Sequence, residues 1–384
     1  MKKRSPFIVF VVILVVSTIG CWDYREINKL SIVTGLAIDR GENSKYKITF
    51  EIVDTQEGGI EKKIKSKLIE SEGESILDSI RNSLKVSSPR LYFGHLDVVI
   101  LSEQIAREGV IDIIDFLNRD TEPRLNIDLM VSKEKTANEI LSAQSTTSVL
   151  RSFEIEQTLK EQDNLSESPR VRVYQFVNHL PCEGIAPVLP VMGVVESAGK
   201  KTFTLSGTAV FKGDKMAGYL NEEESNFYCF VSDKVKRGLI VLEDSPETEG
   251  VDITLEIYDS VTKVKPVYSD GKVSMNIMIK VSAALAEQTG SNKFESGIEV
   301  LKVQKAAEEY LKSNTVKTIQ SVQKKFGLDI FGFGKEVYSE MPKLWKEISQ
   351  DWNSIYKEMD VNVSVSVELK NRGLLRDPIA VGEE

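Results

Sequence analysis

The chain has 384 residues, of which 41% are hydrophobic and 28% are charged, and its formal net charge is −9. At about 150 residues per domain, this length predicts two or three domains with ordinary cores. The acidic balance argues against a nucleic-acid partner, because phosphates are bound by clustered lysine and arginine.

The first 21 residues have the layout of an export signal. Residues 2–4 are basic, an unbroken apolar run covers 7–16, and small residues lead to Gly20 and Cys21. The apolar run is about half of the roughly 20 residues that span a bilayer as a helix. This pattern is typical of a signal peptide over residues 1–20. The alternative is an uncleaved transmembrane anchor with a buried cysteine.

The cysteine that follows Ile19 and Gly20 resembles a bacterial lipobox, with Thr18 where leucine is usual. This resemblance implies cleavage between Gly20 and Cys21 and lipidation of the Cys21 thiol by diacylglycerol, with palmitate-type acyl chains. Each buried methylene contributes about 0.8 kcal/mol, so two or more chains anchor a protein stably. Removal of the three basic residues leaves the mature chain near a charge of about −12, so we expect acyl chains, and not electrostatic adsorption, to hold it at the membrane.

The other two cysteines are Cys182 and Cys229. They either pair outside the cell or remain as two buried thiols, and one possible pair in a long chain is weak evidence for a disulfide. We expect buried thiols. With two histidines and no CxxC, the sequence contains no metal cluster of usual spacing, and we expect no cofactor.

Residues 21–200 alternate strands with helices, which predicts an N-terminal α/β or α+β domain. The predicted elements are a hairpin over 30–52, a loop at 56–67, a helix at 75–84, a buried strand at 91–101, a helix from the N-cap Ser102 with a break at Gly109, a helix at 110–117, a strand at 125–131, helices at 137–141 and 149–159, and an exposed loop at 162–169. A polar turn at 197–201 places a domain boundary near Lys200.

Residues 201–372 show runs of strands followed by helices, which predict a C-terminal α+β domain. The elements are strands at 203–211 and 216–220, an acidic helix start at 222–224, strands at 251–257, 261–267 and 273–281, a long helix at 298–326, a Gly- and Phe-rich break at 327–335, a helical stripe over 344–359, a strand at 361–369, and a loose tail at 373–384. The fold class is therefore α+β and multidomain, with mixed sheets flanked by helices behind the signal peptide.

The break at 327–335 contains Gly334-Lys335, which is reminiscent of a phosphate-binding loop. The pattern fails, because Asp329 stands where the first glycine is needed and Glu336 stands where serine or threonine would hold magnesium. We expect the glycines to form a tight turn that places Phe331 and Phe333 in a core.

No other pattern indicates catalysis. His95 lies in an apolar stretch and is interpreted as a hydrogen-bonded core histidine, and His179 lies in a predicted loop without a nucleophile motif. Trp345 and Trp352 are seven positions apart and are either core residues, which we favour, or an exposed sugar-stacking pair. Neither GxSxG nor HExxH is present, and most acidic residues are expected on solvated faces. We therefore predict that the protein is not an enzyme.

The string Cys-Trp-Asp-Tyr-Arg-Glu-Ile-Asn at 21–28 resembles the start of mature Ger(x)C lipoproteins, the C subunits of spore germinant receptors. Similar strings of that family occur, in the same order, at 30–39, His95, 119–124, 203–224 and 326–369. The shared order, together with the lipobox, is stronger evidence than any one string.

The resemblance implies a membrane-anchored, non-catalytic lipoprotein subunit of a nutrient germinant receptor that acts in spore germination. It places the body on the outer face of the cytoplasmic membrane, which is the spore inner membrane. The implied partners are the lipid bilayer, through lipidated Cys21, and two integral membrane subunits. The alternative is a solute-binding lipoprotein of a transporter, which needs two α/β lobes around a ligand cleft, and the α+β second half argues against it. An extracellular hydrolase ranks third.

Overall fold

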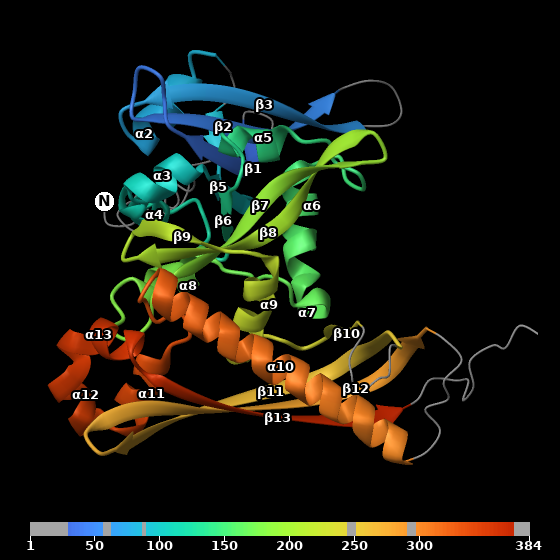
Figure 1. Cartoon of the computed structure of the whole chain (residues 1–384). Helices are drawn as coiled ribbons and strands as arrows, with labels where there is room; N and C mark the ends of the chain where they lie inside the picture. Colours follow the sequence, from blue (N-terminus) through green and yellow to red (C-terminus); the bar gives the residue numbers. More distant parts are fainter. Residues whose placement is uncertain (1–29, 57–62, 87–89, 244–250, 290–296, 372–384) are drawn as a thin grey trace, which may run out of the picture.

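The computed structural model describes residues 30–56, 63–86, 90–243, 251–289 and 297–371. The predicted signal peptide, Cys21 and the tail at 373–384 lie outside this part. Two mixed sheets organise the described chain (Figure 1): β1–β9 form a nine-stranded sheet, and β10–β13 form a four-stranded sheet.

The elements follow one another in this order along the chain: β1 (Leu30–Asp39), β2 (Tyr46–Gln56), β3 (Lys63–Gly73), α2 (Ile76–Ser83), β4 (Arg90–Tyr92), β5 (Val98–Leu101), α3 (Glu103–Glu108), α4 (Ile111–Arg119), β6 (Asp128–Ser132), α5 (Ala137–Ser142), α6 (Arg151–Lys160), α7 (Gln162–Leu165), α8 (Val173–His179), β7 (Val188–Ser197), β8 (Lys200–Lys212), β9 (Lys215–Leu220), α9 (Glu222–Val231), β10 (Gly238–Leu242), β11 (Ile253–Ser269), β12 (Lys272–Gln288), α10 (Gly297–Lys325), α11 (Phe333–Glu340), α12 (Pro342–Ile348), η3 (Ser349–Asp351), α13 (Trp352–Lys357) and β13 (Asp360–Asn371). Mixed sheets flanked by helices confirm the predicted α+β class.

The larger sheet has a parallel centre and antiparallel edges. Strands β1, β5, β6 and β7 run parallel to one another, whereas β2 and β3 on one side and β8 and β9 on the other pair in antiparallel fashion. Strand β5 is buried on both faces: Val99 packs in the core with α3, α4 and α8, and Val98 packs in a second core with α5 and α6. This double cover explains its continuous apolar sequence.

Two buried carboxylates attach helices to this sheet. Asp39, at the end of β1, accepts hydrogen bonds from the first two backbone N–H groups of α5, at 2.6 and 3.1 Å. Glu51, on β2, accepts from the first two N–H groups of α6, at 2.9 and 2.8 Å. The first N–H groups of a helix have no partner within it, so a carboxylate there is stabilising. Asp39 and Glu51 are therefore exceptions to the expectation that most acidic residues lie on solvated faces.

The smaller sheet is covered on one face by α9, α10 and α11. Along β12, Val273, Met275, Ile277, Ile279 and Val281 are buried, which confirms the predicted alternation. The two strands predicted at 251–257 and 261–267 are one strand, β11, with a register shift between Ile257 and Asp259. A bulge interrupts the alternation of the sequence without ending the strand.

The predicted boundary near Lys200 lies at the hairpin turn between β7 and β8. Both of these strands, and β9 after them, belong to the larger sheet, which therefore takes strands from both sides of that boundary. A polar turn in the sequence marks a reversal of the chain, but it does not say which strands pair across it. The division into domains at 200 stays a prediction.

Three further expectations are wrong. The strand predicted at 91–101 is two strands, β4 and β5, with a turn between them that exposes His95. The edge strand β3 begins at Lys63, within the loop predicted at 56–67, and its polar residues suit a sheet edge. The exposed loop predicted at 162–169 contains the short helix α7 and two buried serines, Ser166 and Ser168.

Candidate functional site

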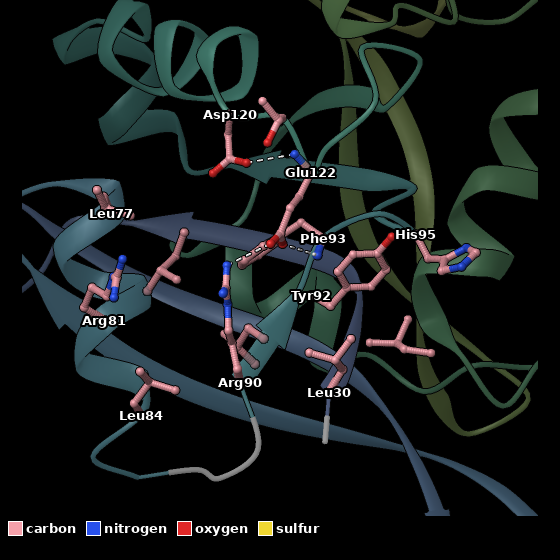
Figure 2. Close-up of a pocket in the computed structure, with 14 residues that line it drawn as sticks. Leu30, Leu77, Arg81, Leu84, Arg90, Tyr92, Phe93, His95, Asp120 and Glu122 are labelled. Atoms are coloured by element: carbon pink, nitrogen blue, oxygen red, sulfur yellow. Dashed lines mark hydrogen bonds and ion pairs between the residues drawn. The ribbon is translucent and has the colours of Figure 1, made fainter. Parts of the chain in front are cut away.

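A hollow of 770 Å³ lies where helix α2, strand β4 and the loop after α4 meet (Figure 2). We call it the α2 hollow. Its walls come from four separate segments: Leu30 and Ile32 on β1; Leu77, Ile80, Arg81 and Leu84 on α2; Arg90 to Phe93 on and after β4, with His95 in the turn beyond; and Asp120, Thr121 and Glu122 in the loop. The hollow thus depends on the packing of four segments and not on one local motif.

Helix α2 gives the hollow its apolar wall. The Ser75 side chain caps the helix by accepting from the backbone N–H of Asp78 at 3.1 Å. Ile76 is buried in the core, whereas Leu77 and Leu84 are 49% and 46% exposed. Leucines seven positions apart lie on one side of a helix, so both side chains border the hollow.

The rim of the hollow carries charges of both signs. Arg90 pairs with Glu122 at 2.8 Å, and the side chains of the two residues are 54% and 20% exposed. The Glu122 backbone N–H donates to Asp120 at 2.9 Å, which shapes the loop (Figure 2). On the opposite side stands the exposed Arg81, which forms no ion pair within the described part of the chain. Glu122 also accepts from the Phe93 backbone N–H at 3.4 Å, so its carboxylate is held in the wall of the hollow while Arg90 remains half exposed.

The predicted core histidine His95 is at the edge of this hollow. Its ring lies edge-on to that of Tyr92, with the ring centroids 6.3 Å apart, and it is exposed in the turn after β4. The interpretation of His95 as a core residue is wrong, because the apolar stretch that contains it folds as two short strands joined by a turn.

Below the turn lies a group of carboxylates. Asp128 is buried and pairs with Arg170 through two bonds of 2.8 and 2.7 Å, and Arg170 also lies 3.4 Å from Glu156. Asp97 lies near them, and burial, followed by the charges of Glu156 and Asp128, raises its pKa to about 6. These carboxylates bind Arg170, a cation of the chain itself, so the group has a structural role.

The break at 327–335 is organised around the buried Asp329. Its carboxylate accepts from the backbone N–H groups of Phe331, Gly332 and Gly334, at 3.1, 2.9 and 2.7 Å, and from the Trp352 indole at 3.0 Å. Burial raises the pKa of Asp329 to about 6. These N–H groups already have an anion from the chain, which agrees with the rejection of a phosphate loop at this position.

The aromatic residues of this region are in the core, as predicted. Phe331 and Phe333 are buried and stack with centroids 5.3 Å apart. Trp345 and Trp352 are also buried and meet edge to face at 5.3 Å. A sugar-stacking role for the tryptophan pair is therefore excluded.

The remaining candidate residues are scattered. His179 ends helix α8, contrary to the predicted loop, and burial lowers its pKa, with Lys234 and Lys335 adding to the effect. Cys182 is exposed and Cys229 is buried, and both thiols are free. Burial raises the pKa of Cys229 to about 12. The expectation of two buried thiols is confirmed for Cys229 and wrong for Cys182.

The described residues contain neither a metal-binding group nor a membrane-spanning helix. No group of three or more histidine, cysteine, aspartate or glutamate residues there is placed to hold a metal ion. No helix among those residues has the length and apolarity that crossing a bilayer requires.

Comparison with known proteins gives matches along nearly the whole chain. A family model described as the spore germination protein N-terminal domain matches residues 23–194, and one described as spore germination B3/GerAC like, C-terminal, matches residues 206–373. Spore germination protein KC of Bacillus subtilis (strain 168) is 23% identical, covering 99% of this chain and 98% of that protein. Spore germination protein B3 of the same organism is 24% identical, covering 97% and 99%.

The fold is also found in a solved structure. The crystal structure of the GerBC protein matches with a TM-score of 0.57 and 21% identity, covering 87% of this chain and 96% of that one. At this identity the match concerns the fold alone.

The α2 hollow brings together two strings that the sequence had singled out only by resemblance, His95 and the segment 119–124. Sequence reasoning missed Leu77 and Arg81. Their signal was present in the helix, because Leu77, Arg81 and Leu84 recur at spacings of four and three on a side of the helix next to that of Ile76.

Proposed function

Because this chain belongs to the spore germination family whose N- and C-terminal models both match it, we propose that it is the lipid-anchored C subunit of a nutrient germinant receptor. The observation that carries the proposal is the match of both models in order, with relatives aligned over almost their full lengths. The chain acts in spore germination from the outer face of the spore inner membrane.

In this function the protein does not turn over a substrate. Its work is to bind two integral membrane subunits and to transmit the nutrient signal through contacts with them. Two features support this: His95 and His179 lie far apart in the chain with no nucleophile motif, and the Asp329 carboxylate is fully used by backbone and indole N–H groups. The alternative of a transporter's solute-binding lipoprotein is less supported, because the smaller sheet is not a second α/β lobe.

The anchor is Cys21, after cleavage behind Gly20. Acyl chains on Cys21 hold the body near its partners at high effective concentration, so each protein contact can be weak by itself. We expect Cys21→Ala to abolish lipid labelling, to leave an uncleaved precursor and to lower the germination rate at least tenfold, in spores with matched protein levels.

The control variant is His179→Ala, which leaves the anchor unchanged and should germinate at close to the parental rate. The proposal fails if Cys21→Ala spores germinate normally, or if a folded His179→Ala protein abolishes the response. Labelled lipid that still attaches to the Cys21→Ala chain would contradict the assignment of the anchor.

A further inference from the structure

We propose that the α2 hollow binds a short, acidic amphipathic segment of an integral membrane subunit, which inserts apolar side chains between α2 and β4 and pairs a carboxylate with Arg81. This inference rests on the proposed function and adds to it the surface used and the chemistry of the partner. The hollow is seen in Figure 2 with α2 on one side and the 120–122 loop on the other.

The hollow is lined by apolar side chains that a bound partner would bury. Leu77 and Leu84 keep about half of their surface exposed, and the buried Leu91 and Phe93 lie on the β4 side. Exposed apolar groups next to a concave apolar wall are typical of protein-binding surfaces. Such interfaces draw most of their affinity from a few anchors that fill pockets.

The charges of the hollow select an acidic partner. Arg81 is exposed between the two leucines, with no ion pair in the described residues, and Lys85 follows one turn later. A guanidinium can hold a carboxylate through two parallel bonds. Arg90 is a second donor, because its half-exposed guanidinium has N–H groups beyond the one that binds Glu122.

The hollow also lies close to where the anchor joins the body. Leu30, one of its lining residues, follows Cys21 by nine positions. Even a fully extended chain spans at most about 3.6 Å per residue, so Leu30 lies within about 32 Å of the lipidated residue. A segment of a membrane subunit that emerges from the bilayer is therefore within reach of this face.

The shape and the charges favour a protein segment over the bilayer surface itself. A planar lipid surface cannot fill a hollow of 770 Å³. Asp120 and Glu122 also line the hollow, and their carboxylates would repel anionic headgroups that came close to the loop. A protein segment can present its own carboxylate to Arg81 and keep it away from Asp120.

The test places a photo-crosslinking amino acid, p-benzoylphenylalanine, at position 77 of the full chain in spores, and identifies the adduct by mass spectrometry. We expect an adduct with an integral membrane subunit of the receptor. Arg81→Glu should lower the adduct yield at least tenfold, and Arg81→Lys, which keeps the charge but loses the two parallel bonds, should lower it less. Lys263→Glu, the same charge reversal on the exposed face of the smaller sheet, is the matched control and should leave the yield unchanged.

The same probe at Leu239, which is 60% exposed on β10, should give no such adduct. An adduct with lipid, with a protein of another kind, or no adduct at position 77 overturns the inference. So does an unchanged yield in an Arg81→Glu protein whose thermal unfolding matches the parent. If the membrane subunits co-purify with the chain but crosslink at 239 and not at 77, only the inference about the surface fails. If they do not co-purify at all, the proposed function fails with it.

Discussion

The α2 hollow and the Asp329 loop both combine charge with apolar side chains, and the chain uses them in opposite ways. Around Asp329 each carboxylate oxygen accepts hydrogen bonds and the neighbouring aromatic rings are buried. In the hollow, Leu77 and Leu84 remain half exposed and Arg81 has no ion pair within the described residues. A polar group whose partners lie within the chain stabilises the fold, whereas one left unpartnered beside exposed apolar groups is available to another molecule.

The largest effect on stability is expected when an interior carboxylate loses its cation. Arg170→Met leaves the buried Asp128 without its two charged hydrogen bonds. Breaking a buried pair in this way costs about 3–5 kcal/mol, measured as the free energy of unfolding in denaturant. Arg107→Met, which removes an exposed pair with Glu103, is the control and should change little. Equal losses in the two variants would contradict the structural role of Asp128.

A smaller loss is expected in the Asp329 loop. Asp329→Asn replaces an acceptor oxygen with an NH₂ group that faces backbone N–H donors. Leaving buried donors unsatisfied costs about 1–3 kcal/mol each, so we expect a loss of about 3 kcal/mol in the same assay. The exposed Asp351→Asn serves as the control. A loss below about 0.5 kcal/mol, the usual size for a surface change, would show that this loop does not depend on its carboxylate.

A smaller effect is expected from Asp97, whose raised pKa makes the free energy of unfolding depend on pH. Its pKa is about 6 in the folded chain against an ordinary value of 3.8, so the folded state binds this proton more tightly than the unfolded state. Its contribution to the free energy of unfolding therefore falls as pH rises from about 4 to about 6.

Asp97→Asn should remove this fall and stabilise the protein relative to the parent above pH 6. We expect about 1 kcal/mol after allowing for solvent screening of this half-buried group. Unfolding curves of the parent and the variant at pH 4 and pH 7 test it. If the two proteins differ by the same free energy of unfolding at pH 4 and at pH 7, the raised pKa of Asp97 is contradicted.

The smallest effect on stability is expected in the hollow itself. Leu77→Ser and Leu84→Ser alter half-exposed side chains and should change the free energy of unfolding by less than about 0.5 kcal/mol. Germination should nevertheless slow severalfold, because the partner loses apolar contacts. Val261→Ser, at a similarly exposed site on β11, should leave germination unchanged. A large loss of stability without slower germination would show that these leucines stabilise the fold and do not contact a partner.

Much of the local structure could be predicted, because neighbouring residues decide it. Ser75 and Ser102 cap the helices that follow them, and alternating residues of β12 lie on opposite faces. The buried aromatic pair at 331 and 333 also followed from the glycines around it. Such patterns involve only a few neighbouring residues, so they can be recognised without knowledge of the rest of the chain.

The sequence by itself determined the class of fold, the order of most elements and the resemblance that leads to the family. Only the tertiary structure decided which acids are buried and where a surface is left open. Asp39 and Glu51 meet helix N-termini that are 98 and 100 positions away. The α2 hollow needs Leu30, α2, β4 and the 120–122 loop together. Contacts between such distant segments depend on how strands pair and helices pack, and no local periodicity encodes that pairing.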